Sequence, residues 1–225
     1  MVNLDNRLGA AFSFCRSGVT SVDVGCDHAR LAAALALEKN CRVIASDVRD
    51  GPLEAARRTL SELNAESVLT VKSDGLDEIS YADDVIICGM GGELIAEIAE
   101  RCRFKGENTR FVLQPMTKAD VMRKRLCKAG FELLEEKTAS EGGKIYSVML
   151  WRYTGKPREI DEIEALCGKN RDRVYLEFVA EKLLKNARGM EKSGGLAEEA
   201  ERLRKQADAV LRKAVDCGNE DRRSD

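Results

Sequence analysis

The sequence predicts an α/β fold in which a mostly parallel sheet is followed by a pair of C-terminal helices. Short apolar runs alternate with amphipathic helical patterns over residues 4–130, which is typical of strands joined by helices. Two further apolar runs flank a Gly-Gly pair at 142–143, as in a β-hairpin. Beyond residue 156 the apolar period lengthens to seven. We therefore expect a domain over 1–155, a helical hairpin over 156–218 and a tail over 219–225.

The fold is organised around the stretch from Val22 to His28. Residues 22–24 read as a buried strand, Gly25 allows a tight turn, and residues 29–39 read as a helix that leaves this turn. Such a turn points backbone N–H groups at a ligand. The next strand, 41–45, leads into Asp47, whose carboxylate can accept hydrogen bonds from ribose hydroxyls. The pattern predicts a nucleoside-containing cofactor across the ends of two neighbouring strands.

The turn also indicates which cofactor it suits. A dinucleotide site needs G-x-G-x-x-G, but here only Gly25 is present, and Asp27 and Arg30 occupy the later positions. An acidic side chain at 27 repels a pyrophosphate. Asp23 and Asp27 instead suit the ammonium and sulfonium of S-adenosylmethionine. A nicotinamide or flavin cofactor, or no cofactor at all, remains the alternative.

Composition limits the remaining possibilities. The chain has 225 residues and a formal charge of −2, enough for one α/β domain with a small appendage and no general affinity for nucleic acid, so any basic patch must be local. Without a long apolar run or a signal peptide we expect a soluble, cytoplasmic protein with no membrane partner. Eight scattered cysteines and one histidine predict core thiols in a reducing compartment and no metal site.

The first helical pattern, residues 4–14, places Leu4, Leu8, Ala11 and Phe12 on one face and Arg7 on another. A helix that only covers the core is the simpler interpretation. Arg7 facing the site or a polyanionic substrate is the functional one.

A second helix follows the strand that ends at Asp47. Asp50 is expected to cap it, and its buried stripe is Leu53, Ala56, Leu60 and Leu63. The third strand, 68–71, leads to Asp74 and Gly75, where a carboxylate can bind the exocyclic amine of adenine. An Asx turn or a helix cap at Asp74 is the structural alternative.

The fourth strand, 83–88, runs into Gly89-Met90-Gly91-Gly92 and then a helix with Leu94, Ile95 and Ile98 on its buried side. Glycines there remove side chains from the place where a methyl acceptor approaches, although packing alone also explains them. A fifth strand, 110–113, ends in Gln114, and Thr117 is expected to cap the next helix, which carries Val121, Met122 and Leu126. Residues 131–137 and 145–151 then form the hairpin, which gives a Rossmann-like class I methyltransferase sheet whose last strand is antiparallel.

Six segments in chain order are similar to one known family. They are D-V-G-C-D-H-A at 23–29, D-V-R-D-G-P-L at 47–53, D-G-L at 74–76, G-M-G-G at 89–92, L-Q-P-M at 113–116 and G-G-K-I-Y at 142–146. The sequence resembles the TrmK family of bacterial tRNA (adenine-N1)-methyltransferases, which act on adenine 22. The resemblance covers residues 4–152 and implies a Rossmann-like catalytic domain followed by a helical coiled-coil domain.

The resemblance implies a role for each motif residue. Asp23, Gly25, Asp27 and His28 would surround the methionine part of S-adenosyl-L-methionine. The ribose and adenine would meet Asp47, Val48, Asp74 and Gly75, and the acceptor side would be formed by Gly89, Met90, Gly91, Gly92 and Gln114. The family commonly has tyrosine and proline where this chain has Arg30 and Ala32, and Ser or Thr where it has Cys26. Arg30 would then meet the acceptor by stacking or through a phosphate.

The implied reaction needs no general base from the protein. N1 of adenine has an unprotonated lone pair that attacks the methyl group directly, so no base is needed, and the product is a cation. Asp27 is the candidate for stabilising that charge, and capping the following helix is its alternative role. His28 acts in catalysis or only orients the turn. The target base must be extruded from tRNA to be reached.

The C-terminal pattern predicts two antiparallel helices. Residues 158–190 read as one helix with Val174, Phe178, Leu183 and Leu184 on its apolar side, and a turn follows at 193–195. The second helix repeats Leu196, Leu203 and Val210, with Ala200, Ala207 and Ala214 between them, as in a coiled coil. Basic side chains form either a stripe for RNA phosphates or ordinary helix ion pairs; they are Lys182, Lys185, Arg188, Arg202, Arg204, Lys205 and Arg212.

Three interpretations remain open at this stage. The first is an S-adenosylmethionine-dependent enzyme that methylates N1 of an adenine in tRNA, acting as a monomer or weak dimer. The second is a cofactor-binding interaction protein without transferase activity. The third is a methyltransferase for another RNA or nucleobase.

Overall fold

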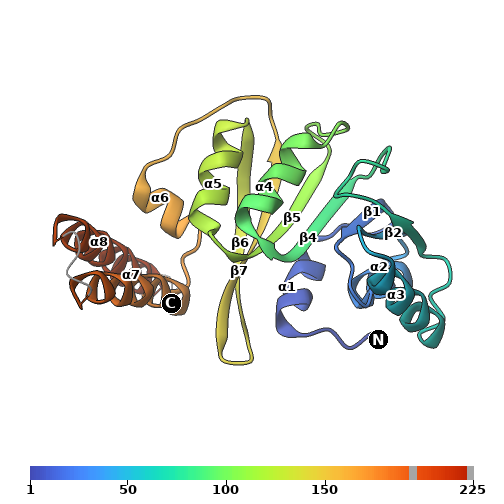
Figure 1. Cartoon of the computed structure of the whole chain (residues 1–225), viewed down its shortest axis with the longest axis horizontal. Helices are drawn as coiled ribbons and strands as arrows, with labels where there is room; N and C mark the ends of the chain where they lie inside the picture. The colour runs from blue at the N-terminus through green and yellow to red at the C-terminus, as the bar shows by residue number, and fades with distance from the viewer. Residues whose placement is uncertain (193–196, 222–225) are drawn as a thin grey trace.

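The computed structural model describes residues 1–192 and 197–221. Its centre is a seven-stranded sheet with strand order β3-β2-β1-β4-β5-β7-β6 (Figure 1). The first five strands are parallel, and β7 pairs antiparallel with both β5 and β6, as predicted. The strands are β1 (Thr20–Val24), β2 (Arg42–Asp47), β3 (Leu69–Lys72), β4 (Asp84–Gly91), β5 (Arg110–Thr117), β6 (Phe131–Glu141) and β7 (Lys144–Tyr153).

Helices cover both faces of this sheet. On one face, α1 (Asn6–Phe14), α2 (Arg30–Lys39) and α3 (Asp50–Glu62) pack over side chains such as Ile86 and Val112. On the other, α4 (Gly92–Arg101) and α5 (Ala119–Lys128) pack over Val85 and Phe111. Strands buried on both faces need the unbroken apolar runs seen in the sequence. The three-layer arrangement leaves the carboxyl ends of the parallel strands free to form a site.

Several predicted helix starts are wrong. Asp50 is the first residue of α3, not its cap, and pairs with Lys72 at 2.7 Å. Thr117 belongs to β5, and α5 is preceded by Lys118, which has a left-handed φ of 56° and makes no side-chain cap. β4 likewise continues to Gly91, with two irregularities in its pairing with β5. Pairing between β4 and β5 continues both strands past the residues that the sequence predicts as turns and caps. On α4, Ile95 and Ile98 are buried but Leu94 is exposed.

The predicted single helix over 158–190 is also wrong. It is divided into α6 (Glu162–Cys167) and α7 (Arg173–Lys192), because Gly168 adopts a φ of +58° and ends α6. A Cβ at Gly168 would lie 2.1 Å from Glu136 Oε2, so the break is set by packing on the sheet domain. Val174, expected on the apolar side, is exposed.

The second half of the hairpin is α8 (Ala197–Asp221), which lies antiparallel beside α7 (Figure 1). Ala200, Ala207, Val210 and Ala214 are buried, as the seven-residue period predicts, and Leu203 is partly buried. Coiled-coil geometry itself stays a prediction. The predicted turn at 193–195 and Leu196 lie outside the described residues. The helix continues past 218, so the predicted tail is helical as far as Asp221.

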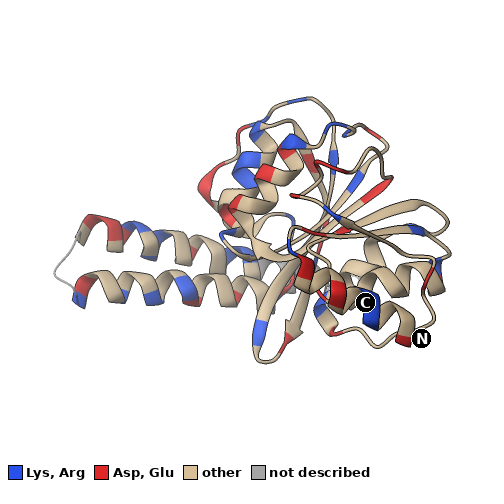
Figure 2. Cartoon of the chain, turned by 45° about the vertical axis from the view of Figure 1, so that its right-hand side comes forward, with Lys and Arg blue, Asp and Glu red and all other residues tan. Residues whose placement is uncertain are grey.

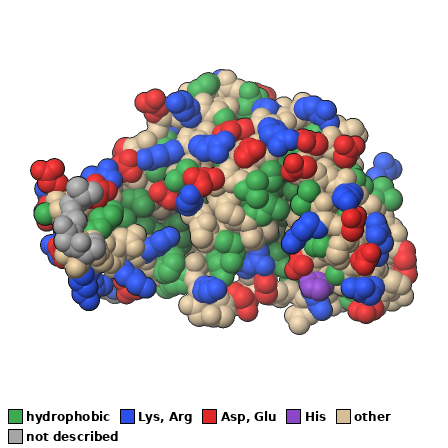
Figure 3. Space-filling view, in the orientation of Figure 1, with side chains coloured by type: hydrophobic (Ala, Val, Ile, Leu, Met, Phe, Trp, Pro, Cys, Tyr) green, Lys and Arg blue, Asp and Glu red, His purple; other side chains and the backbone are tan. Residues whose placement is uncertain are grey.

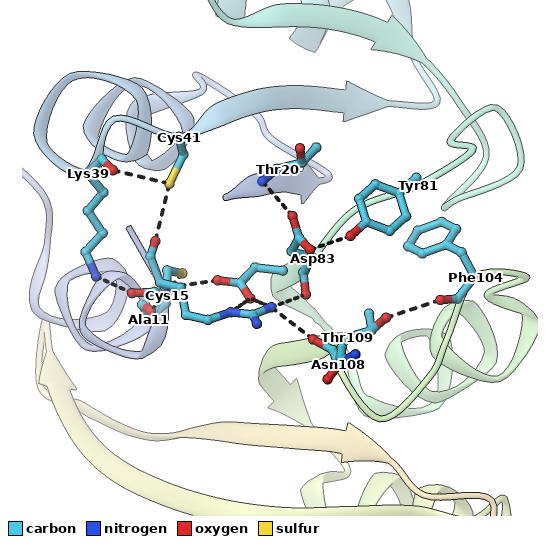
Figure 4. Close-up of polar contacts among 12 residues, drawn as sticks. Ala11, Cys15, Thr20, Lys39, Cys41, Tyr81, Asp83, Phe104, Asn108 and Thr109 are labelled. Atoms are coloured by element: carbon cyan, nitrogen blue, oxygen red, sulfur yellow. Dashed lines mark hydrogen bonds and ion pairs between the residues drawn. The ribbon is translucent and has the colours of Figure 1, made fainter. Parts of the chain in front are cut away.

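The amino-terminal edge of the sheet is closed by polar contacts. Asp84 is completely buried and accepts hydrogen bonds from Arg16 Nε at 2.8 Å and Nη2 at 2.7 Å. Next to it, Asp83 accepts from the Thr20 backbone N–H at 2.9 Å and from the Tyr81 hydroxyl (Figure 4). These groups stabilise the fold at this edge, and the carboxyl ends of the parallel strands lie at the opposite edge.

Three general features concern the described residues. None of their helices is long and apolar enough to cross a bilayer. Among the cysteines whose side chains the structure describes, Cys88 is partly exposed, the others are buried, and none forms a disulfide; the others are Cys15, Cys26, Cys41, Cys102, Cys127 and Cys167. No group of three or more His, Cys, Asp or Glu side chains among the described residues is placed to hold a metal ion.

Candidate active site

A cavity of about 530 Å³ lies at the carboxyl ends of β1, β2 and β4, where the strand order reverses between β1 and β4. Ligands of open α/β sheets bind at this position, and the volume suits a nucleoside. The N-terminal part of the chain and α1 form another wall. Its lining is Asp5, Arg7, Leu8, Asp23, Gly25, Cys26, Asp27, His28, Arg30, Leu31, Asp47, Arg49, Cys88, Gly89, Met90 and Met116.

The floor of the cavity is the turn after β1. Gly25 has a φ of +71°, and the N–H groups of Gly25 and Cys26 both donate to the Ser46 carbonyl, at 2.8 and 3.0 Å. Asp27 and Ala29 also adopt left-handed φ values, 49° and 50°, which non-glycine residues rarely do. Such strain concentrates at functional sites. It also moves the start of α2 to Arg30, so Asp27 does not cap that helix.

Two buried carboxyl groups reach this floor from neighbouring strands. Asp23, on β1, is 5% exposed, and Asp47, at the end of β2, is 8% exposed. Burial raises the pKa of Asp23 to about 7, although the Ala32 backbone and the Arg7 guanidinium lower it. Asp47 accepts a hydrogen bond from the Arg49 N–H at 3.0 Å. A cavity with two carboxyl groups at its base favours a ligand with positive charge or with hydroxyl donors.

Cys26 lies between these groups. Burial, followed by the Asp23 and Asp47 carboxylates, raises the pKa of its thiol to about 12. At neutral pH the thiol therefore stays protonated and is a poor nucleophile. Cys26 fills the floor without contributing a charge.

Arg7 projects from α1 into the cavity and is held in place. Its Nη1 donates to Gln114 Oε1 at 2.8 Å, and its Nη2 lies 3.4 Å from Asp5 Oδ2. Gln114 Oε1 also accepts from the Gly89 N–H at 3.0 Å, and its amide nitrogen donates to the Pro115 carbonyl at 2.9 Å. One buried amide thus joins α1, β4 and β5. Gln114 is fully buried and outside the cavity lining, and it holds Arg7 in place; its predicted contact with the acceptor stays a prediction.

Met90 covers the glycine turn. A Cβ built on Gly25 would lie 2.2 Å from Met90 Cε, so only glycine lets this thioether rest on the backbone there. Gly89, with a φ of +85°, is next to Arg7 Nη1. In both places a glycine backbone lies against a side chain of the cavity wall, Gly25 against Met90 and Gly89 against Arg7.

The other predicted residues line this cavity in part. Asp27, His28 and Arg30 are exposed at its rim, and His28 Nε2 lies 3.8 Å from Asp27 Oδ1. Val48 and Asp74 are exposed outside the lining, at the ends of β2 and β3, and the Asp74 carboxylate has no partner among the described residues. A Cβ at Gly75 would meet Ile98 of α4 at 3.0 Å.

Gly91 and Gly92 do not border the cavity. A Cβ at Gly92 would lie 2.4 Å from the Lys118 carbonyl and 2.9 Å from that of Thr117, and one at Gly91 would lie 3.6 Å from Thr117 Oγ1. Packing against the connection from β5 to α5 therefore explains Gly92. That Gly92 also leaves space for the acceptor stays a prediction.

Seven lining residues received no site role in the sequence analysis: Asp5, Leu8, Cys26, Leu31, Arg49, Cys88 and Met116. Asp5 could have been predicted as an N-cap, because an aspartate directly precedes a helical pattern. In the structure its side chain accepts a hydrogen bond from the Leu8 N–H. Cys88 and Met116 adjoin predicted site residues in sequence. Nothing local indicates that α1 crosses the edge of the sheet.

Comparison with known proteins supports this placement. A family described as "Methyltransferase domain" matches residues 4–149. The tRNA (adenine(22)-N(1))-methyltransferase of Bacillus subtilis is 33% identical over 172 residues, 74% of this chain and 72% of the relative.

Solved structures extend the similarity to the whole chain. The crystal structure of the B. subtilis M1A22 tRNA methyltransferase TrmK has a TM-score of 0.78 and 25% identity, and the match covers 96% of this chain and 99% of that one. A Streptococcus pneumoniae protein, described as a candidate tRNA (m1A22) methyltransferase and solved with S-adenosyl-L-methionine, has a TM-score of 0.79 and 26% identity over 93% and 100%. The chain therefore belongs to the TrmK family within the methyltransferase-domain proteins.

Proposed function

We propose that this protein transfers a methyl group from S-adenosyl-L-methionine to N1 of an adenine in tRNA, at position 22. The observation that supports it most is the cavity floor, to which Asp23 of β1 and Asp47 of the neighbouring strand β2 each contribute a nearly buried carboxyl group. The chain's membership of the TrmK family supports the same reaction and nucleotide.

The residues of the cavity fit the cofactor. Asp23, together with the rim residue Asp27, would hold the cationic amino acid part, and Asp47 would accept hydrogen bonds from the ribose hydroxyls. Val48 and the segment Asp74–Gly75 follow β2 and β3, where the adenine would extend from the ribose. Bound there, S-adenosyl-L-methionine supplies an electrophilic methyl group on its sulfonium.

The chain's own groups then orient the acceptor. Gly89 and Met90 border the cavity on the side of β4, and Arg7, fixed by Gln114, provides a guanidinium that can donate hydrogen bonds to the acceptor nucleotide. The adenine N1 needs no base, because its lone pair is free at neutral pH. Asp27 would stabilise the positive charge that develops on the adenine, and His28 would hold the strained turn.

The direct test is methylation of unmodified tRNA. Purified protein is incubated with labelled S-adenosylmethionine and a bacterial tRNA transcript, and reverse-transcription stops locate the methylated base, since N1-methyladenine does not pair. We expect a single stop at adenine 22, absent when that adenine is replaced by guanine.

The alternative interpretations predict different results. Cofactor binding without incorporated label would identify an interaction protein, and label at another position or only in another RNA would identify a different substrate. Either outcome would overturn the proposal.

A further inference from the structure

A second hollow, of about 280 Å³, lies where the helical hairpin meets the sheet domain. Met116 lines both this hollow and the cavity at the strand ends, so the two are adjacent. We name it the interdomain groove. Its walls are Pro115–Asp120 on one side, Ile145–Ser147 of β7 below, and Leu166, Tyr175, Phe178, Val179, Lys182, Leu183 and Asn186 on the side of the hairpin.

The groove combines apolar side chains with cations at its edge. Tyr146 and Phe178 are partly exposed, and Lys118 and Lys182 are exposed; Lys118 pairs with Glu93 of α4. Figure 3 shows hydrophobic side chains exposed at the junction of the hairpin and the sheet domain, with Lys and Arg side chains around them. Aromatic rings bordered by positive charge are the elements that bind unpaired nucleotides, through stacking and phosphate contacts.

The cations continue along one face of α7. Lys182, Lys185 and Arg188 line a smaller hollow with Phe178 and Glu181. At a rise of about 1.5 Å per residue, Lys182 and Arg188 are about 9 Å apart along the helix. None of these three side chains forms an ion pair or side-chain hydrogen bond within the part of the chain that the structure describes.

The basic side chains of α8 differ in this respect. Arg202 pairs with Glu199 at 2.6 Å, Arg204 with Glu191 of α7 at 2.7 Å, and Lys205 with Glu201 at 3.8 Å. Figure 2 shows acidic and basic positions interspersed along both helices. The stripe predicted from the sequence is thus divided. Arg202, Arg204 and Lys205 of α8 have acidic partners and Arg212 donates to the Asp208 backbone carbonyl at 3.4 Å, whereas Lys182, Lys185 and Arg188 of α7 have no acidic partner among the described residues. A desolvated phosphate gains more from a cation that has no competing carboxylate.

We propose that the interdomain groove binds a nucleotide of the RNA substrate next to the methylated adenine, with its base against Phe178 and Tyr146. The phosphates of the strand then lie on the row formed by Lys182, Lys185 and Arg188. This inference depends on the proposed function, because it needs an RNA whose target base is extruded into the adjacent cavity. Asp120 and Glu181, which also border these hollows, disfavour an acidic peptide as the occupant.

The test compares two triple variants that each remove three charges from the hairpin. K182Q/K185Q/R188Q neutralises the α7 row, and R202Q/R204Q/K205Q neutralises the paired row on α8. Affinity for an unmodified tRNA transcript is measured with the full chain over a range of salt concentrations. We expect the α7 variant to bind at least tenfold more weakly and its salt slope to fall by about 2, since each phosphate contact contributes about 0.7 in single strands. The α8 variant should change affinity less than threefold.

A single substitution tests the base contact. Phe178→Leu keeps an apolar side chain but removes the ring, and Phe178→Trp keeps a ring. We expect the leucine variant to raise KM for tRNA about tenfold with kcat little changed, and the tryptophan variant to restore it. Equal losses in both triple variants, or unchanged affinity in all of them, would overturn the inference.

This failure is distinguishable from failure of the proposed function. If the wild-type protein methylates tRNA and the α7 variant does so with the same KM, only the groove assignment is wrong. If the wild-type protein neither binds nor methylates tRNA, the proposed function is wrong. Calorimetry with S-adenosylmethionine shows whether each variant has kept its fold and cofactor site.

Discussion

Arg123 of α5 and Glu136 of β6 form an ion pair at 2.7 Å in which both side chains are almost completely buried. Arg123 also donates to the carbonyls of Ala165 and Leu166, at 2.8 and 3.1 Å, and to the Tyr175 hydroxyl at 3.0 Å. The pair therefore fixes α6 and α7 against the sheet domain, and with them the wall of the interdomain groove.

Removing one charge of this pair should be costly. We predict that Glu136→Gln lowers the free energy of unfolding by about 3–5 kcal/mol, because it leaves the Arg123 guanidinium buried without a counter-charge. Chemical denaturation measures this loss, and hydrogen exchange in α7 shows whether the hairpin loosens first. Glu132→Gln, at an exposed pair with Arg152, is the control and should cost less than about 1 kcal/mol. Similar losses in both variants would contradict the role given to Arg123 and Glu136.

The contacts of this ion pair could not be predicted from the sequence. The break between α6 and α7 at Gly168 makes room for Glu136 and Arg123, which are distant in sequence, so the helical pattern over 158–190 does not reveal it. The pairing of Arg204 with Glu191 likewise depends on how the two helices align. The core strands were predictable because burial on both faces requires continuous apolar runs.

The candidate site shows the same division. Asp23, Gly25 and Asp47 were predictable because a strand, a turn and a second acidic strand end occur within one short segment. The contacts of Gln114 and Gly92 were not predictable, because α1 and the connection after β5 meet these residues only in the folded chain. The motifs showed that these two positions matter but not how. In the structure, Gln114 positions Arg7, and Gly92 packs against the connection after β5.

Asp47 provides a direct test of the cofactor site. We predict that Asp47→Ala weakens S-adenosylmethionine binding at least a hundredfold, since a buried acceptor for the ribose hydroxyls is lost. Isothermal calorimetry measures the change. Asp50→Ala is the matched control, because Asp50 is exposed, pairs with Lys72 and lies outside the cavity lining. An unchanged affinity in Asp47→Ala would refute the ribose assignment.

Gln114 tests the positioning of Arg7. We predict that Gln114→Leu lowers kcat/KM for tRNA at least tenfold, because Arg7 and the Gly89 N–H lose their common acceptor. The affinity for S-adenosylmethionine should change less than threefold. Arg7→Lys should show the same pattern, since an ammonium cannot reproduce the geometry of the guanidinium. A loss of cofactor affinity as large as the loss of turnover would place Arg7 in the cofactor site instead.

A substitution at Gly92 tests whether this glycine is needed for packing or for access of the acceptor. We predict that Gly92→Ala destabilises the fold by about 1–3 kcal/mol, because its Cβ would collide with the Lys118 and Thr117 carbonyls. Thermal unfolding measures this. Gly9→Ala, in α1 with no atom within 4 Å of the new Cβ, should be neutral or slightly stabilising. If Gly92→Ala kept full stability and lost only methyl transfer, the glycine would serve the acceptor.

Asp23 makes both stability and cofactor binding depend on pH. Its pKa is about 7 in the folded chain against an ordinary value of 3.8, because the carboxyl group is buried. The unfolded chain therefore releases this proton first as pH rises, and stability falls between about pH 4 and 7, by up to about 4 kcal/mol. Asp23→Asn should remove this loss and be more stable than the wild type at pH 8. Denaturation at pH 5 and pH 8 measures the difference.

Cofactor binding should show the opposite trend. A cationic ligand binds the ionised carboxylate, so affinity for S-adenosylmethionine should rise by up to tenfold per pH unit from pH 5.5 towards about pH 7. Arg7, Asp27, His28, Asp47 and Cys26 also face this part of the cavity. Burial and the two carboxylates raise the pKa of the Cys26 thiol to about 12, above this interval. Asp23→Asn should bind weakly at every pH, with His28→Gln as the control that keeps the wild-type slope. A slope that survived in Asp23→Asn and vanished in His28→Gln would assign the titration to the imidazole, and the buried carboxylate would no longer explain why the site prefers a cation.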